Sequence, residues 1–437
     1  MAAQRRRCLP DRLLGGVLRI GVLEMRSVIP IALLLAAFHG IGRSQSSAVK
    51  PDTCLDCHSA LEDRLGRPAQ LIQADIHRRN GFSCADCHGG DPTSMDMEVS
   101  MDPRKGFLGK IDRWRIPELC ARCHSDATLI HKFRPQQRVD QLALYRTSVH
   151  GKRLAGGDVR VATCIDCHSV HDIGEVRDTL SPVHPLKLPA TCARCHADAE
   201  HMKGYDIPTS QFEQYQRSVH WEALAKRGDL SAPSCATCHG SHGAAPPGVA
   251  SVEHVCGTCH VVFQNLFDQS PHKPAFEAMG FAACVVCHSN HQVLPPASEM
   301  LGVDGGAVCL RCHTKGDPGY TTAATMKQEI HRLRSALAAA EAVLKQAETS
   351  GMEVSEGQIQ LASAHEEWIK ARVEVHAFRL DAVKSPVSRG LEMAQKGRQT
   401  GLDALRERNV RRLGLVVSLL AMAITLAGLW MAVRRLE

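Results

Sequence analysis

The pentapeptide Cys-x-x-Cys-His occurs nine times between residues 54 and 313. In each copy the two thiols, three residues apart, can reach the two vinyl groups of one haem, and the histidine that follows can bind its iron. A single CxxC is also typical of zinc sites and redox disulfides, but nine copies with histidine in the same place favour c-type haem attachment. The sequence therefore predicts nine covalently bound haem c groups.

The motifs supply two sets of predicted haem-binding residues. The thioether cysteines are Cys54, Cys57, Cys84, Cys87, Cys120, Cys123, Cys164, Cys167, Cys192, Cys195, Cys235, Cys238, Cys256, Cys259, Cys284, Cys287, Cys309 and Cys312. The proximal iron ligands are His58, His88, His124, His168, His196, His239, His260, His288 and His313.

The motifs are organised as repeats. Residues 148–196, 218–260 and 270–313 each contain Ser-x-His, then CxxCHxxH, then CxxCH. Residues 77–124 form a degenerate copy, in which Asp91 stands where the additional histidine of CxxCHxxH is expected. We interpret the region as one single haem site, at 54–58, followed by four two-haem modules.

The additional histidines are predicted to be second axial ligands. An iron that only passes electrons favours two strong ligands, because oxidation then changes its geometry little. Seven histidines recur at module positions and are the predicted distal ligands: His77, His150, His171, His220, His242, His272 and His291. Weaker candidates, for which a surface position is the alternative, are His131, His184, His201, His254 and His376.

Two irons are left without a predicted distal ligand, and the sequence does not assign the distal histidines to particular irons. Met95, Met97 and Met101 lie in the module that lacks its additional histidine. They are possible axial ligands, with an ordinary loop position as the alternative.

The composition indicates how this region folds. Aromatic residues make up only 4% of the chain, so closely spaced haems must serve as the interior. We expect residues 45–320 to be a mainly α-helical domain with much irregular loop, built around stacked haems. Without haem it should not fold.

The two ends of the chain indicate the compartment. Residues 1–44 read as an export signal, with Met25 as a possible true start. Residues 413–433 carry no charge and are flanked by arginines, which predicts one transmembrane helix within 411–437. Since haem c is attached outside the cytoplasm, the bulk of the protein is expected on the periplasmic side, with a short cytoplasmic tail. The formal charge of +6 resides near these ends and gives no support for nucleic-acid binding.

Residues 321–410 are predicted to form a helical hairpin and stalk. Apolar residues recur at helical spacing from Ile330 to Ala347 and again from Leu361 to Ala382. Ser385-Pro386 is expected to end the second helix, and a third helix is expected to follow.

The paired CxxCHxxH and CxxCH units resemble the doubled-CxxCH multihaem cytochromes c of bacteria. The Ser-x-His element is distantly similar to the group of octahaem cytochromes, hydroxylamine oxidoreductases and pentahaem nitrite reductases. The resemblance implies periplasmic electron transfer, often linked to quinones through a membrane partner. The pentahaem nitrite reductases mark their catalytic haem with CxxCK, whereas every motif here ends in histidine. The hydroxylamine oxidoreductases use a tyrosine cross-linked to the catalytic haem, and no tyrosine here lies in a motif that matches.

The leading hypothesis is a membrane-tethered electron carrier in anaerobic respiration. It would relay electrons between a quinol-oxidising or b-type cytochrome subunit and periplasmic redox proteins. The alternative is a reductase or oxidase of a small nitrogen or sulfur compound at one open-coordinate haem. A structural or haem-storage role is the remaining possibility. The motifs assign no catalytic residue.

Overall fold

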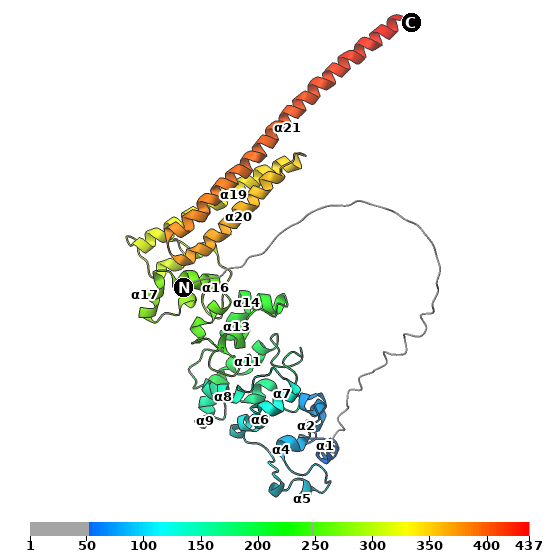
Figure 1. Cartoon of the computed structure of the whole chain (residues 1–437), viewed down its shortest axis with the longest axis vertical. Coiled ribbons are helices and arrows are strands. Elements are labelled where there is room, and N and C mark those ends of the chain that lie inside the picture. Colours follow the sequence, from blue (N-terminus) through cyan, green and yellow to red (C-terminus); the bar gives the residue numbers. More distant parts are fainter. Residues whose placement is uncertain (1–51, 247, 437) are drawn as a thin grey trace, which may run out of the picture. The chain divides into compact units, whose positions relative to one another are not determined.

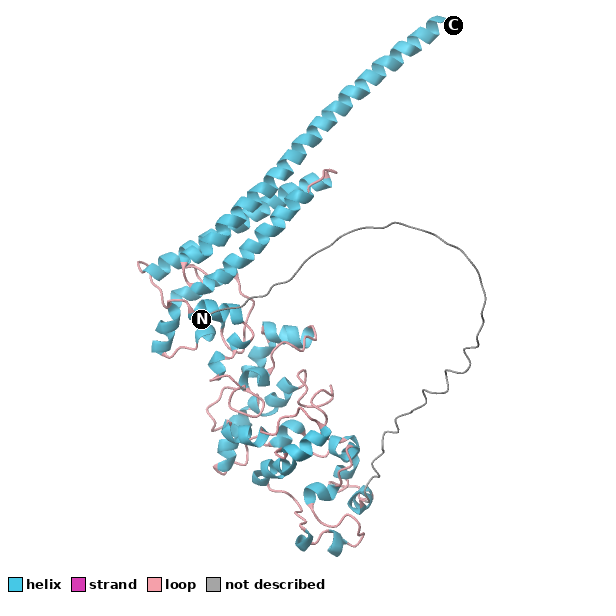
Figure 2. Cartoon of the chain, viewed as in Figure 1, coloured by secondary structure: helices cyan, strands magenta, loops and turns pink. Residues whose placement is uncertain are grey.

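The computed structural model describes residues 52–246 and 248–436. The predicted export signal, including Met25, lies outside the described residues. The described chain consists of helices joined by loops and turns and contains no strand (Figure 2). This confirms the prediction of a mainly α-helical protein with much irregular loop.

The motif region is built from short helices. The α-helices are α1 (Thr53–Ser59), α2 (Arg67–Leu71), α3 (Ile76–Arg79), α4 (Cys84–His88), α5 (Met97–Ser100), α6 (Ile116–His124), α7 (Ala127–Phe133), α8 (Gln141–Thr147), α9 (Val149–Ala155), α10 (Cys164–His168), α11 (Leu188–His196), α12 (Ala199–Met202), α13 (Gln211–Gln216), α14 (Val219–Trp221), α15 (Cys235–His239), α16 (Val261–Asp268), α17 (His272–Met279) and α18 (Ala283–His288). Shorter turns of tighter or wider helix are η1 (Ile72–Ala74), η2 (Pro103–Lys105), η3 (Arg113–Arg115), η4 (Glu222–Lys226), η5 (Val252–His254), η6 (Cys256–Thr258), η7 (Ser298–Met300) and η8 (Val308–Arg311).

Local side chains start the motif helices. Helix α4 begins with a capping box, in which the Ser83 side chain accepts the backbone N–H of Asp86 and the Asp86 side chain accepts the backbone N–H of Ser83. Thr163 and Asp166 form the same arrangement at the start of α10. Helices α6 and α11 instead carry proline in their first turn, where a missing backbone N–H costs nothing. The CxxCH pentapeptide is thereby held as about one helical turn.

The chain turns sharply after the first motif of each module. The residue that follows the motif histidine has a positive φ in all four modules: 70° at Gly89, 71° at Ser169, 78° at Gly240 and 65° at Ser289. This left-handed region is uncommon for serine. The positive φ recurs at the same position of all four modules, so the chain reverses direction in the same way in each of them.

Three long helices follow the motif region: α19 (Pro318–Thr349), α20 (Ser355–Glu374) and α21 (Leu380–Leu436). They pack side by side (Figure 1). Leu333, Leu337, Ala364 and Val387 are among the residues buried between them. Both clusters of buried apolar side chains found in the described residues belong to this bundle. The motif region has no comparable apolar core of its own.

The predicted end of the second long helix at Ser385-Pro386 is wrong. Helix α20 ends at Glu374, and the chain passes through η9 (Val375–Ala377) and Phe378, whose φ is 50°. Pro386 lies inside α21 and is buried, at the cost of one backbone hydrogen bond. The reversal is made by the left-handed residue, and the predicted third helix and apolar span are one continuous helix.

Among the described residues α21 is the one helix long and apolar enough to cross a membrane. Its apolar part, residues 413–433, is exposed throughout. It makes no contribution to the core of the bundle.

Candidate haem sites

Eight of the nine motif histidines face a second histidine. The distances between ring centroids run from 5.9 to 6.4 Å. The pairs, with the motif histidine second, are His77–His124, His171–His88, His150–His196, His242–His168, His220–His260, His291–His239, His272–His313 and His376–His288.

This spacing fits one metal ion between each pair of rings. A metal–imidazole bond is about 2 Å long, and the ring centre lies about 1 Å beyond the nitrogen, so two rings on opposite sides of one iron are about 6 Å apart. Within the described residues no cluster of three or more His, Cys, Asp or Glu side chains could hold a metal ion. The donor set thus fits haem iron with two imidazoles and offers no zinc-type cage.

The first kind of second histidine comes from within the same module. His77, His150, His220 and His272 each face the second motif of their own module. The residue two positions earlier prepares this placement: Asp75, Ser148, Ser218 and Ser270 are all buried, and each accepts a backbone N–H from the turn that carries the histidine. The Ser-x-His element is therefore a cap that fixes the histidine in the first helical turn.

The second kind comes from the following module. His171, His242 and His291, three residues after a motif histidine, face the first motif of the preceding module at His88, His168 and His239. The left-handed turn after the first motif of each module carries these histidines toward the preceding module. For the last module no following module exists, and His376 of η9 takes the equivalent place opposite His288.

Burial favours the neutral form of twelve of the facing imidazoles. Loss of solvation lowers the pKa of His168 to about 4. Burial also lowers the pKa of His124, His150, His171, His196, His220, His239, His242, His272, His288, His291 and His376. A neutral ring keeps the lone pair that an iron ion requires.

Hydrogen bonds orient several of the motif histidines and of the histidines that face them. The Nδ1 atom lies 2.9 Å from the Leu65 carbonyl in His58, 3.1 Å from the Gly109 carbonyl in His88 and 2.9 Å from the Val373 carbonyl in His376. In His77 and His313 the Nδ1 atom instead lies within hydrogen-bond distance of a carboxylate, that of Asp75 and that of Asp317 respectively. With Nδ1 committed, Nε2 is the nitrogen available to a metal.

Consecutive motifs contact one another in the order of the sequence. Helices that carry neighbouring motifs contact each other: α6 contacts α10, α11 contacts α15, and α18 contacts η5, just ahead of the seventh motif. Three arginines inside second motifs donate to carbonyls of the first motif: Arg122 to Cys87, Arg194 to Asp166 and Arg311 to Val286. Asp52 accepts the backbone N–H of Cys84 and so links the first motif to the second. Burial, and after it the nearby Cys256 thiol of the seventh motif, raises the pKa of Cys238 in the sixth motif.

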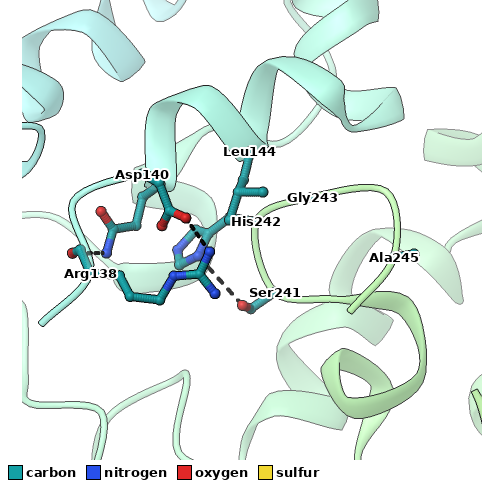
Figure 3. A pocket seen from close by; sticks show the side chains of 8 residues that line it. Arg138, Asp140, Leu144, Ser241, His242, Gly243 and Ala245 are labelled. Atoms are coloured by element: carbon teal, nitrogen blue, oxygen red, sulfur yellow. Dashed lines mark hydrogen bonds and ion pairs between the residues drawn. The ribbon is translucent and has the colours of Figure 1, made fainter. Parts of the chain in front are cut away.

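A small cavity adjoins one of the paired histidines. It measures about 260 Å³ and is lined by Arg138, Asp140 and Leu144 from around α8, and by Ser241, His242 and Gly243 from the turn after the sixth motif (Figure 3). Arg138 and Asp140 form an ion pair. Both charges act on His242, but burial is the main cause of its lowered pKa.

The structure brings together all seven module histidines with motif histidines, and also His376. It places the other weaker candidates elsewhere. His131 points its Nε2 at the Gln137 carbonyl, and His201 stacks on Tyr205. His184 accepts a backbone N–H from Leu186, and His254 bonds to Ser251. Within the described residues none of these four faces a motif histidine.

Sequence reasoning missed residues that support the sites. Tyr145 and Tyr215 precede Ser148 and Ser218 by three positions and donate their hydroxyls to the carbonyls of Ala162 and Pro233, just ahead of motifs. The recurring Tyr-x-x-Ser-Val-His pattern was the available signal. The same holds for the Arg of CxRCH, present in three of the four second motifs.

Comparison with known proteins gives two similarities. Residues 76–197 and 228–314 match the family model of cytochrome c3. Over 150 residues the chain is 27% identical to the cytochrome c-type protein NrfB of Escherichia coli O6:H1. That match covers 34% of this chain and 66% of the relative, a little less than two thirds of its length. No solved structure matches the chain.

The family match includes eight of the nine motifs, and of the three complete modules it leaves out only the Ser-x-His element at 218–220. The relative is itself a c-type cytochrome. The chain is therefore a multihaem cytochrome c that carries covalently bound haem.

Proposed function

We propose that the protein is a membrane-tethered periplasmic cytochrome with nine haems, which relays electrons between a quinol-linked membrane partner and periplasmic redox proteins. The observation that carries the proposal is the succession of contacts between consecutive motifs along the chain. Haems bound in this order form a single row without a gap.

The residues of the chain suit transfer rather than bond chemistry. Haem iron, once bound, supplies the change between the ferric and ferrous states. At eight sites the two facing imidazoles would hold a haem iron from both sides, an arrangement that would need little reorganisation on electron transfer. Bis-histidine ligation also favours low potentials, which suits donors such as menaquinol in anaerobic respiration.

The C-terminal helix supports the tether. The exposed apolar part of α21 follows directly from the bundle, and Arg411 and Arg412 precede it while Arg434 and Arg435 follow. Haem attachment outside the cytoplasm places everything before this segment in the periplasm and leaves the short tail in the cytoplasm. Because His376 contributes to the eighth site, the bundle also joins the last haems to the anchor.

The partners follow from what the chain offers the membrane. Within the described residues the one helix that could cross a membrane, α21, has no histidine in its apolar part and offers no ligand to a pair of b-type haems. A separate quinol-oxidising or b-type cytochrome subunit is therefore proposed as the membrane donor, with soluble periplasmic redox proteins at the other end. Binding of nucleic acid is not part of the proposal.

One observation favours the alternative function. Among the described residues no imidazole faces His58. A reductase or oxidase of a small nitrogen or sulfur compound needs an open position of this kind, so this site is where such chemistry would occur.

The test counts haems, electrons and turnover in purified full-length holoprotein. The proposal predicts nine haems per chain by pyridine haemochrome, nine electrons accepted in a reductive titration, and no steady turnover with nitrite or hydroxylamine. Deletion of residues 411–437 should release the haem-loaded protein from the membrane fraction. Fewer haems, or sustained turnover of either compound, would contradict the relay.

A further inference from the structure

The turn after the first motif of each module aims one residue at the preceding module. In the second, third and fourth modules that residue is His171, His242 or His291, three positions after the motif histidine. Each faces the first motif of the module before it. In all three cases, therefore, the residue three positions after the first motif histidine faces the first motif of the preceding module.

The first module keeps this turn but lacks the ligand. Gly89 has a φ of 70°, within the 65–78° range of Ser169, Gly240 and Ser289. Asp91 occupies the position of the histidine. By the same rule its target is the motif that precedes the first module, which is Cys54 to His58.

The segment after Asp91 does lie against that motif. In α1 the backbone N–H of Thr53 donates to the Pro92 carbonyl at 2.9 Å, and its hydroxyl lies 2.7 Å from the Ser94 carbonyl. Thr53 is the residue immediately before Cys54. The turn therefore reaches the first motif as the equivalent turns reach theirs.

Both oxygens of the Asp91 carboxylate are already engaged. Oδ2 accepts from Lys105 Nζ at 2.8 Å, and Oδ1 accepts from the backbone and the hydroxyl of Thr93 at 3.0 and 2.6 Å. The backbone is held as well, since Asp91 N donates to Ser100 and Gly90 N donates to Lys105. This carboxylate is a partner in an ion pair and is not free to serve as an iron ligand.

We propose that this chain gives the first haem a single axial ligand, His58, and that the opposite position is a binding site for a small uncharged ligand of ferrous iron such as carbon monoxide or nitric oxide. Asp91 is paired with Lys105, so the turn aimed at this motif offers an anion no net attraction from either group. The inference rests on the proposed pairing of histidines at the other eight sites.

The first experiment titrates dithionite-reduced, full-length holoprotein with carbon monoxide. One molecule should bind per nine haems, and the oxidised protein should show one high-spin ferric signal by electron paramagnetic resonance. Nine haems with no carbon monoxide bound would overturn this inference alone. More than one bound, or fewer than nine haems, would instead contradict the proposed histidine pairing.

The second experiment restores the missing ligand. Asp91→His recreates CxxCHxxH and should abolish both carbon monoxide binding and the high-spin signal while nine haems remain. Glu98→His, which adds a histidine at an exposed position seven residues after Asp91, should leave both the carbon monoxide binding and the high-spin signal unchanged. Retention of carbon monoxide binding by a nine-haem Asp91→His protein would contradict the inference. So would a methionine–histidine charge-transfer band in the near-infrared magnetic circular dichroism that vanishes when Met95 and Met97 are changed to leucine.

Discussion

The imidazole of His376 lies 6.1 Å from that of His288, and the two ring planes are only 13° apart. His288 belongs to the eighth motif, whereas His376 belongs to the turn between α20 and α21. Two residues further on, Phe378 packs 3.9 Å from the ring of His272, which faces the ninth motif. The long-helix bundle thus contributes side chains to the last two candidate haem sites.

Replacing His376 tests this link. His376→Met should convert one of the nine haems to histidine–methionine ligation and raise its potential, by on the order of 100 mV. Near-infrared magnetic circular dichroism and a redox titration report both changes. His365→Met, on the exposed side of α20, is the matched control and should alter neither. A nine-haem His376→Met protein with only bis-histidine spectra would show that His376 is no ligand.

The motif region should depend on haem for its fold, whereas the bundle should not. Both apolar clusters of the described residues lie in the bundle, and the motif region has little else to bury. A chain produced without haem attachment should be digested over residues 52–317 by a dilute protease and leave a resistant fragment containing α19, α20 and the first half of α21. Equal resistance of the motif region would contradict this account.

Helices α20 and α21 approach closely at two glycines. A Cβ atom on Gly397 would lie 2.9 Å from the Gly357 carbonyl oxygen, which is backbone and cannot move aside. Gly397→Val should therefore destabilise the bundle by about 1–3 kcal/mol, as overpacking commonly does. Hydrogen exchange of α20 amides in the holoprotein measures the effect. Gly414→Val, where nothing lies within 4 Å, should not change α20 exchange, and a similar effect of both variants would rule out the close approach as the cause.

The bundle should lose stability in acid through Glu367. Burial by itself raises the pKa of this carboxyl, but hydrogen bonds and ion pairs with Lys370 and Arg389 outweigh burial and hold the pKa below the usual 4.5. The folded state thus binds fewer protons than the unfolded state, so the stabilisation is complete above pH 4.5 and is lost as the pH falls below it.

Glu367→Gln tests this dependence. The variant should lose about 1–2 kcal/mol near neutral pH. It should also show a shallower fall in α20 protection between pH 5 and pH 3, after correction for intrinsic exchange. An unchanged slope would show that another group is responsible.

The local chemistry of the motifs made much of the site predictable. CxxCH and its repeated partners are short-range patterns, so the proximal histidines and the seven module histidines could be named from the sequence. Their pairing could not, because His171, His242 and His291 cross to a different module, and only the backbone reversal at residues such as Ser169 decides the target.

His376 shows the same limit more sharply. It lies 63 residues beyond the last motif histidine. There it belongs to no repeated module position, so the sequence contains no recurring pattern that marks it as a ligand. Its role depends on where the bundle docks. The misplaced end of the second long helix has a related cause: Pro386 was the strongest local signal, yet the reversal occurs at Phe378, a residue with no turn-forming character.

The relay itself is tested by following one electron along the row. A ruthenium photosensitiser on Lys315→Cys, an exposed site beside the ninth motif, injects an electron, and a His171→Met substitution gives the second haem a distinguishable spectrum as a reporter. Removing the fifth haem with Cys192→Ala and Cys195→Ala should slow arrival at the reporter by orders of magnitude. Removing the first haem, beyond the reporter, with Cys54→Ala and Cys57→Ala should leave the rate unchanged. Equal arrival rates in both eight-haem proteins would contradict a single continuous row.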